Sequence, residues 1–203
     1  MITAVIFDMG GVLVELGPIT EIIGPGSTIG PEAFWKKWIT SPTVRLFETG
    51  GCSPEEFGER LVEEFAVAIS AEELVDHFAA WPKGLMAGAT RLVEDLRGHV
   101  DLAVLSNTNA LHWQHQADAA EVRGLFDRQY LSHEMGLIKP DAAIFEAVVA
   151  DMDRRAEEIL FVDDNQANVD GARSVGLAAE LTRGVDQARE AIDRYGLGST
   201  QIR

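Results

Sequence analysis

Cysteine is nearly absent from this chain, because Cys52 is the only one among 203 residues. No disulfide can form within the chain, and one free thiol favours a reducing compartment, so we expect a cytoplasmic protein. Cys52 lies in an expected loop between Gly51 and Ser53, with no evident partner that would activate a thiol. The composition therefore argues against a disulfide-stabilised fold and against a cysteine nucleophile.

Positive charge is also scarce. The 17 lysines and arginines are outnumbered by 33 aspartates and glutamates, so the net charge is −16, and Lys36-Lys37 is an isolated pair. A field of this sign repels nucleic acids and anionic membrane surfaces, and we expect neither as a partner. An anionic substrate would need a local cation to overcome the field, which makes a bound metal ion physically attractive.

Long apolar runs are missing as well. No run approaches the roughly 18 residues of a membrane span, and the segment from Ile2 to Asp8 lacks the basic flank and cleavage site of a secretory signal. The apolar residues form short runs instead, each followed directly by polar residues: Thr3–Phe7, Leu102–Leu105 and Ile159–Val162. Such runs are typical of parallel strands that are covered on both faces.

Segments with helical spacing alternate with these runs. They are marked by Leu92, Val93 and Leu96 before Gly98, by residues 144–149 after Pro140-Asp141, and by residues 169–175 before Gly176. The alternation predicts an α/β fold with a doubly wound parallel sheet. In such sheets ligands bind at the carboxyl ends of the strands.

A longer insertion interrupts the alternation after the first strand. Residues 15–81 have an amphipathic, helical pattern, with helix starts expected at Pro31 and Ser53-Pro54 and helical spacing through Leu61, Val62, Phe65 and Ile69. We therefore expect a core domain of residues 1–14 and 82–203 and a small helical cap of residues 15–81. The tryptophans of this segment are expected to pack the cap rather than to stack on a substrate: Trp35, Trp38 and Trp81.

Polar residues follow the expected strands where a ligand would bind. Asp8 precedes Gly10-Gly11, Ser106 begins a Ser-Asn-Thr-Asn segment, and Asp163-Asp164 follows the third run. Two adjacent carboxylates repel each other unless a cation or donors neutralise them, and Mg²⁺ is a suitable hard cation. Taken singly, Asp8 has an alternative explanation as a turn cap, and Lys139 has one as a solvated lysine.

Four segments in this order resemble the motifs of the haloacid dehalogenase superfamily. They are Phe7-Asp8-Met9-Gly10-Gly11-Val12-Leu13, Val104-Leu105-Ser106-Asn107-Thr108-Asn109, Gly136-Leu137-Ile138-Lys139-Pro140, and Phe161-Val162-Asp163-Asp164-Asn165 continuing to Asn168 and Gly171-Ala172. The resemblance covers essentially the whole chain and implies a Rossmann-like core with a helical cap. Within the superfamily the chain is most similar to bacterial sugar-phosphate phosphatases, including glucose-1-phosphate phosphatases that also carry Asp-x-Gly.

The resemblance also implies a role for each motif residue. Asp8 would attack phosphorus and form an aspartyl-phosphate, and Lys139 would neutralise the nucleophile and the transferred group. Ser106 and the backbone amide of Asn107 would hold phosphate oxygens. Mg²⁺ would be bound by Asp8, the backbone carbonyl of Gly10 and Asp164, with Asp163 assisting directly or through water.

Gly10 departs from the commonest pattern of the superfamily, which has an aspartate at this position. That aspartate would protonate the leaving oxygen and then activate water, a contribution of about 10²–10⁴-fold in rate. His112 and His133 are conceivable substitutes, although each has an ordinary explanation as a surface histidine. His112 and His115, three residues apart, fit a helix surface better than a metal site, because no third ligand is evident. Arg45 could contact a phosphate or sugar, but a solvated arginine is the more ordinary interpretation.

The leading hypothesis is a Mg²⁺-dependent phosphatase that hydrolyses a small phosphorylated metabolite, such as a sugar phosphate. Two alternatives stay open. The absence of an acid/base at Gly10 would also fit a weak or inactive protein that binds phosphorylated ligands. A 2-haloacid dehalogenase lacks the second aspartate too, but it needs no metal and would leave Asp163-Asp164 unexplained. The sequence does not indicate an oligomeric state.

Overall fold

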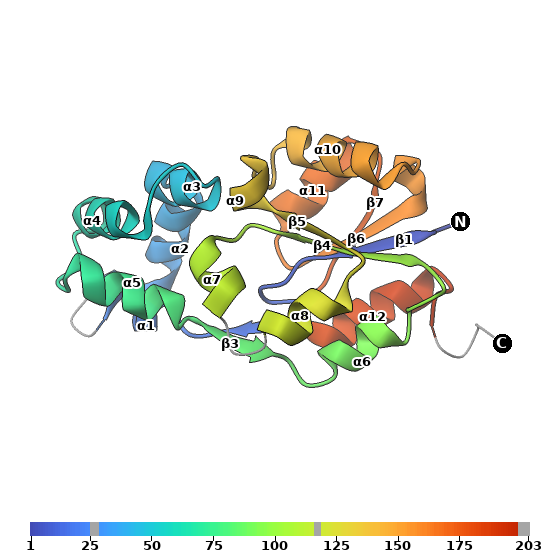
Figure 1. The fold of residues 1–203 in the computed structure, drawn as a ribbon, viewed down its shortest axis with the longest axis horizontal. Helices are drawn as coiled ribbons and strands as arrows, with labels where there is room; N and C mark the ends of the chain where they lie inside the picture. Colours follow the sequence, from blue (N-terminus) through green and yellow to red (C-terminus); the bar gives the residue numbers. More distant parts are fainter. Residues whose placement is uncertain (25–28, 116–118, 199–203) are drawn as a thin grey trace.

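A computed structural model describes residues 1–24, 29–115 and 119–198. Figure 1 shows a sheet flanked by helices at one end of the molecule and a group of helices at the other. The N-terminus lies at the end of the molecule remote from this helical group. The chain therefore runs along the sheet as β1 before it enters the helical group, which is the predicted cap.

The main sheet has five parallel strands in the order β5-β4-β1-β6-β7. The central strand β1 (Ala4–Phe7) is completely buried, as a strand covered on both faces requires. The sheet confirms the predicted doubly wound α/β fold. Its other strands are β4 (Asp101–Ser106), β5 (Arg128–Leu131), β6 (Ile159–Asp163) and β7 (Ala178–Leu181).

Helices cover both faces of this sheet (Figure 1). One face packs against α6 (Ala89–Glu94), α8 (Ala119–Leu125) and α12 (Gly184–Arg194). The other packs against α10 (Ala142–Met152) and α11 (Gln166–Ser174), beside the short helices α9 (Ser132–Met135) and η1 (Ala156–Glu158). Alternate residues of β1 enter the two apolar clusters, Val5 and Phe7 on the first face and Ala4 and Ile6 on the second.

The end of one of these helices corrects the sequence-based prediction. The pattern at Leu92, Val93 and Leu96 predicted a helix running to Gly98, but α6 ends at Glu94 and Leu96 lies in the following turn. Gly98 has a φ of 79° in that turn. A turn can present apolar side chains to a core at a spacing that looks helical, and Leu96 is buried here.

The cap contains α1 (Thr20–Ile23), α2 (Pro31–Ile39), α3 (Pro42–Glu48), α4 (Pro54–Phe65) and α5 (Ala71–Ala79). Helices begin at Pro31 and Pro54, as predicted, and Ser53 and Glu56 form a capping box at the start of α4. Ile69 lies beyond α4, contrary to the predicted helical register, because Ala66 ends the helix in a left-handed conformation.

An aromatic cluster fills the centre of the cap. Trp38 stacks on Phe34, with 5.5 Å between ring centroids, and Trp81 stacks on Phe78 at 6.3 Å. Both tryptophans are buried, as predicted for a cap core, whereas Trp35 is 37% exposed. Burial of these rings stabilises a unit that would otherwise have only short helices.

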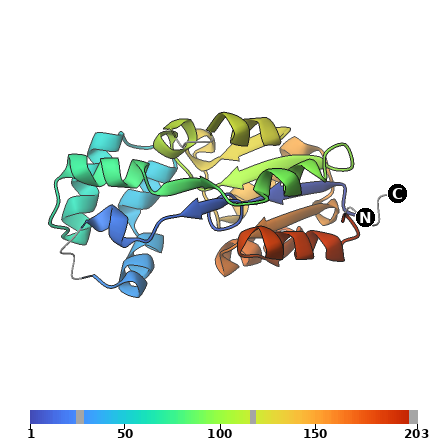
Figure 2. The ribbon, with the colours of Figure 1, turned by 90° about the horizontal axis from the view of Figure 1, so that it is seen from below.

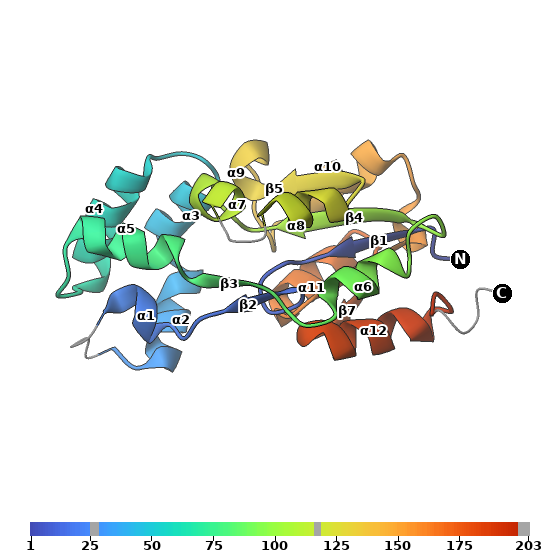
Figure 3. The same cartoon turned by 60° about the horizontal axis from the view of Figure 1, so that its bottom comes forward.

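Two antiparallel strands join the cap to the core (Figures 2 and 3). They are β2 (Val14–Leu16) and β3 (Pro82–Leu85), and they pair through Val14 with Leu85 and Glu15 with Gly84. The prediction of a helical pattern from Glu15 onward is therefore wrong at its first residues. The domain boundaries at residues 15 and 81 remain a prediction. No helix of the described residues is long and apolar enough to cross a membrane.

Candidate active site

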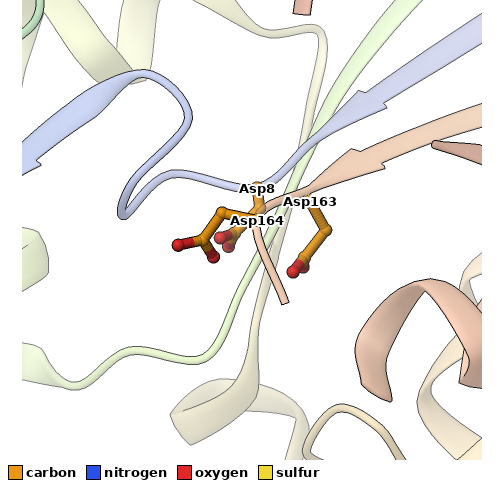
Figure 4. Close-up of side chains that lie close together, drawn as sticks. All are labelled: Asp8, Asp163 and Asp164. Atoms are coloured by element: carbon orange, nitrogen blue, oxygen red, sulfur yellow. The ribbon is translucent and has the colours of Figure 1, made fainter. Parts of the chain in front are cut away.

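The sheet register brings together the carboxylates that the sequence separates. Phe7 of β1 is paired with Val104 of β4 and with Val162 of β6. The next residues, Asp8 and Asp163, therefore leave adjacent strands at the same level. Carboxylate oxygens of Asp8, Asp163 and Asp164 lie within 4.8 Å of one another, and Figure 4 shows the three side chains converging.

Lys139 connects two of these carboxylates. Its Nζ atom donates to Oδ1 of Asp8 and to Oδ2 of Asp163, each at 2.7 Å, and to the backbone carbonyl of Leu105 at 2.9 Å. The ammonium thus uses its three donors on three acceptors, and its side chain is 1% exposed. Lys139 is therefore a buried, fully paired cation and not a solvated turn lysine.

Asp163 is held by donors on several sides. Its Oδ1 accepts from the backbone N–H of Asn165 at 2.8 Å and from Nδ2 of Asn168 at 3.0 Å, while Oδ2 accepts from Lys139. These bonds occupy the carboxylate that the sequence assigned an assisting role toward metal. In this arrangement Asp163 orients Lys139 and the loop after β6.

Asp164 approaches the turn after β1. A Cβ atom at Gly11 would lie 2.3 Å from Oδ2 of Asp164, and Gly11 has a φ of 75°, so only glycine fits here. The pKa of Asp164 is raised to about 6, chiefly by burial and then by the charge of Asp163, against the opposing effect of Lys139. Asp164 is partly buried and takes no part in the Lys139 bridge.

Asp8 is in an environment that disfavours its charge. Burial raises the pKa of Asp8 to about 7; Lys139 acts in the opposite direction, and Asp163 and Asp164 add to the increase. Burial alone would lower the pKa of Lys139, but the same carboxylates raise it instead. The cluster thus holds three carboxyl groups against one ammonium, and it lacks the positive charge that would keep all of them ionised.

The donor set fits a magnesium ion. Oxygen ligands around one or two carboxylates suit Mg²⁺, and a divalent cation would offset the excess negative charge at Asp8 and Asp164. A cation here would also lower the pKa of Asp8 and so favour its ionised form. The raised pKa values of Asp8 and Asp164 are consistent with a site that binds a cation.

The segment after β4 lies beside this cluster. Ser106 ends the strand and is buried, and Asn107 pairs twice with the backbone of Lys139: its Nδ2 donates to the carbonyl at 3.0 Å and its Oδ1 accepts from the N–H at 2.9 Å. Thr108 donates its N–H to Oγ of Ser132 at 2.9 Å. The side chain of Asn107 therefore holds the backbone of Lys139 in place.

A cavity of about 80 Å³ opens between the core and the cap next to these residues. That volume holds several water molecules, because one needs roughly 10–15 Å³. The lining includes Gly10, Ser106 and Asn107 as well as large apolar side chains, namely those of Leu16, Phe78, Trp81 and Trp113. Trp81 thus packs the cap and also lines the cavity, which the sequence-based interpretation treated as alternatives.

Glu48 is the cavity residue that the sequence did not reveal. It is the last residue of α3 in the cap and is partly buried. Burial raises its pKa to about 7, with Asp8 adding to the increase and Lys139 opposing it. A glutamate at a helix end has no distinctive pattern in one sequence, so only the folded cap could place it here.

The two candidate histidines differ from their expected surface positions. His112 lines the cavity, where its Nε2 lies 2.7 Å from the carbonyl oxygen of Phe78 and its Nδ1 lies 3.3 Å from Nδ2 of Asn109. Burial lowers the pKa of His112 to about 4. The interpretation of His112 as a surface histidine is therefore wrong. His133 does not line the cavity, and burial lowers its pKa as well.

The remaining candidates lie away from the carboxylate cluster. Arg45 pairs with Asp141 at the start of α10 and is exposed, so it links cap and core instead of entering the cavity. Cys52 is a free, partly buried thiol whose pKa is raised by burial, in agreement with its exclusion as a nucleophile. The side chain of His115 lies outside the described residues.

The chain is similar to a family of hydrolases and to known phosphatases. The family of haloacid dehalogenase-like hydrolases matches the chain over residues 2–176. A sesquiterpene phosphatase from Aspergillus oryzae is 30% identical over 177 residues, which cover 86% of each chain. A D-ribitol-5-phosphate phosphatase from Bacteroides thetaiotaomicron is 24% identical over 193 residues, covering 87% of this chain and 89% of the relative.

A solved structure agrees with the fold. An enzyme of the same family from Bacteroides thetaiotaomicron, in complex with magnesium and inorganic phosphate, superposes with a TM-score of 0.73 at 26% identity. The superposition covers 90% of this chain and 95% of the other. The similarity therefore includes the cap as well as the sheet.

Proposed function

Because this chain belongs to the haloacid dehalogenase-like hydrolases and is a phosphatase of that family, we propose that it hydrolyses a small phosphomonoester through an aspartyl-phosphate, with Mg²⁺ as cofactor. The observation that carries the proposal is the Lys139 bridge. A buried ammonium 2.7 Å from both Asp8 and Asp163, beside Asp164, is an arrangement for handling a transferred phosphoryl group.

In this proposal Asp8 is the nucleophile. Its carboxylate oxygen attacks phosphorus, the bond from phosphorus to the ester oxygen breaks, and water later hydrolyses the aspartyl-phosphate. Lys139 neutralises Asp8 and the charge that gathers on the phosphoryl oxygens. Ser106 and the backbone amide of Asn107 hold those oxygens where both residues line the cavity.

Asp8, Asp164 and the backbone carbonyl of Gly10 would hold the metal ion, with Asp163 acting through water. When bound, Mg²⁺ would supply positive charge that orients the phosphoryl group and favours the ionised form of Asp8. The carboxylate convergence and the raised pKa values of Asp8 and Asp164 support this assignment.

Two classes of leaving group deserve testing. A sugar or polyol phosphate is the expectation from the sequence, and one relative is a D-ribitol-5-phosphate phosphatase. A specific observation favours a second class, the phosphate of an apolar alcohol: the cavity is lined by Leu16, Phe78, Trp81 and Trp113, and another relative is a sesquiterpene phosphatase. Apolar surface of this kind binds hydrocarbon better than hydroxylated carbon.

The test is phosphate release from D-ribitol 5-phosphate, glucose 1-phosphate and farnesyl phosphate, with Mg²⁺ and with a chelator. We expect turnover of at least one substrate, its loss with the chelator, and its recovery when Mg²⁺ is restored. Asp8→Asn should abolish turnover, because an amide cannot act as the nucleophile. The exposed Asp76 on α5 provides a control, and Asp76→Asn should retain full activity.

The same assay separates the alternatives that the sequence left open. Tight binding of phosphorylated ligands without any turnover would indicate an inactive binding protein. Halide release from 2-haloacids in the presence of the chelator would indicate a dehalogenase. Either result would contradict the proposed phosphatase mechanism.

A further inference from the structure

Position 10 leaves a gap in the proposed mechanism. Phosphoryl transfer to Asp8 releases an oxygen that needs a proton unless it is a good leaving group, and the second step needs a base for water. Gly10 offers neither. The cluster residues are also engaged, because Lys139 uses all three donors and Asp163 accepts from three groups.

Among the described residues, Glu48 is the carboxyl-bearing side chain that lines this cavity outside the cluster. Glu48 lies in the cap and Gly10 in the core, and both line the same cavity. An added Cβ at Gly10 would lie 3.0 Å from Cδ1 of Leu16, which also lines this cavity. A side chain at position 10 would therefore project toward the space that Glu48 borders.

The carboxyl of Glu48 is also unengaged. Among the described residues no hydrogen bond or ion pair to its side chain is found, in contrast to Glu56 and Glu73, whose carboxylates cap helices. A partly buried carboxyl without a partner is costly to the fold, and such groups cluster at functional sites.

The other proton donor in the cavity is less suitable. Both ring nitrogens of His112 have partners, Phe78 on the cap and Asn109 on its own loop. A neutral imidazole that donates from Nε2 and accepts at Nδ1 satisfies both, so a proton shuttle through His112 would break one of these bonds. Its pKa of about 4 leaves no acidic proton at neutral pH.

We infer that Glu48 is the general acid and base of the phosphatase reaction, supplied by the cap in place of a residue at position 10. The inference rests on the proposed function.

In the first step an oxygen of Asp8 bonds to phosphorus, the ester bond breaks with its electron pair on the leaving oxygen, and the Glu48 carboxyl gives that oxygen its proton. In the second step the Glu48 carboxylate takes a proton from water as the water oxygen bonds to phosphorus. The bond to Asp8 then breaks, which frees phosphate and restores both side chains.

The surroundings of Glu48 agree with this role. Its pKa of about 7 gives both protonation states near neutral pH, which is the condition for a group that acts first as acid and then as base. Asp8 and Lys139 act on Glu48 from the core, and His112 of α7 lines the same cavity. Two helices pack against α3, and their titratable and charged groups are His133 and Glu134 on α9 and Glu55, Glu56, Glu59, Arg60, Glu63 and Glu64 on α4. Arg45 of α3 itself pairs with Asp141.

The placement also makes catalysis depend on the cap. Gly50, two residues after Glu48, packs against the backbone of His133 on α9, since an added Cβ would lie 2.4 Å from that carbonyl oxygen. The end of α3 is therefore seated directly on the core. A proton donor in this position is assembled only when cap and core are together, which would exclude bulk water from the aspartyl-phosphate.

The experiment compares Glu48→Gln with the wild type on two substrates. One is the alkyl or sugar phosphate found active in the panel, and the other is 4-nitrophenyl phosphate, whose leaving group needs no proton. Glu48→Gln should lower kcat/KM by about 10²–10⁴-fold on the alkyl ester and by less than about tenfold on the aryl ester. With the aryl ester, rapid mixing should also show a burst of nitrophenol, because phosphorylated Asp8 accumulates when no base activates water.

Two further variants sharpen the result. Glu59 lies on the exposed surface of α4, and Glu59→Gln should behave as the wild type on both esters. Gly10→Asp in the Glu48→Gln background should recover part of the alkyl ester activity, since it needs only a small shift of Leu16. The fall of kcat/KM at alkaline pH should disappear in Glu48→Gln, while titration of the substrate remains in both enzymes.

Equal losses on both esters without a burst, or no loss on either, would overturn the inference while leaving the phosphatase assignment intact. In that case Asp8→Asn would still be inactive against an active wild type. A wild type that hydrolyses neither ester would overturn the proposed function and this inference with it.

Discussion

The single side chain of Lys139 pairs with two buried carboxylates of the site. Burial of Asp8 and Asp163 would be costly if they were unpaired, and a single ammonium serves both. In the sequence Lys139 has an ordinary explanation as a turn lysine, and only its position within the four motifs indicated otherwise. The buried bridge contributes to the fold as well as to the site.

Removal of this bridge should destabilise the protein. We expect Lys139→Met to lower the free energy of unfolding by about 3–5 kcal/mol, because two buried carboxylates lose their partner. Lys83 pairs with Glu21 at 2.6 Å, but both side chains are about 40% exposed, so Lys83→Met should cost less than about 1 kcal/mol. Denaturant unfolding of the two variants measures the difference, and similar costs would contradict the buried pairing.

The position of Glu48 in the cavity could not be inferred from its sequence neighbours. Asp8, Ser106 and Asp163 were identifiable because each directly follows an apolar strand, where a ligand site is expected. Glu48 follows Phe47 in an amphipathic helix, like many surface glutamates. Its proximity to the site comes from the packing of α3 on the core, which no local pattern encodes.

At the scale of elements, one contact joins cap and core across the cavity. His112 on α7 (Ala110–His115) contacts the backbone of Phe78 on α5, and the two rings lie 4.2 Å apart. The sequence placed His112 on a helix correctly, but its surface position is partly covered by Phe78 of the cap.

This contact predicts a pH dependence of stability. The pKa of His112 is lowered from about 6.5 to about 4, so the unfolded chain binds a proton that the folded protein does not. The stabilising difference is complete above the unfolded pKa and is lost as the pH falls toward 4, by at most about 3 kcal/mol.

The measurement is denaturant unfolding of the wild type and of His112→Gln at several pH values. The glutamine does not titrate, so the stability advantage of the wild type should shrink on acidification from about pH 7 to about pH 4.5. A difference that stays constant with pH would mean that His112 is not held neutral. Carboxylates elsewhere affect both proteins alike and cancel in the comparison.

The whole molecule carries a large negative charge, with a net value of −16. Repulsion among so many negative charges opposes compact folding. Asp8, Asp163 and Asp164 place part of this negative charge together at one edge of the sheet. Any salt screens the general repulsion, but only a specifically bound cation neutralises the cluster. The two effects can therefore be separated.

We expect MgCl2 to raise the Tm more than NaCl at the same ionic strength. At a concentration one hundred times Kd, binding stabilises by about 2.7 kcal/mol, which is roughly 5–10 °C for a chain of this size. Asp164→Asn should lose most of the magnesium-specific increase, while Asp76→Asn on the cap surface should keep it. Calorimetry or differential scanning fluorimetry gives the result, and equal shifts in both salts would argue against a metal site.

The sequence by itself determined the α/β class, the inserted helices and the residues at the carboxyl ends of β1, β4 and β6. These features follow from periodicity and from the order of short apolar runs, which are local properties of the chain. Helix ends were less predictable: Leu96 and Ile69 fit a helical spacing yet lie in turns.

The tertiary structure decided which side chains from distant parts of the chain lie next to one another. Sheet register set Asp8 level with Asp163, and the position of Lys139 turned separate charges into a bridge. The packing of the cap set Phe78 against His112 and brought Glu48 to the cavity that Gly10 also lines. These relations depend on contacts between residues far apart in the chain, and such contacts are fixed only when the whole core and cap are packed together.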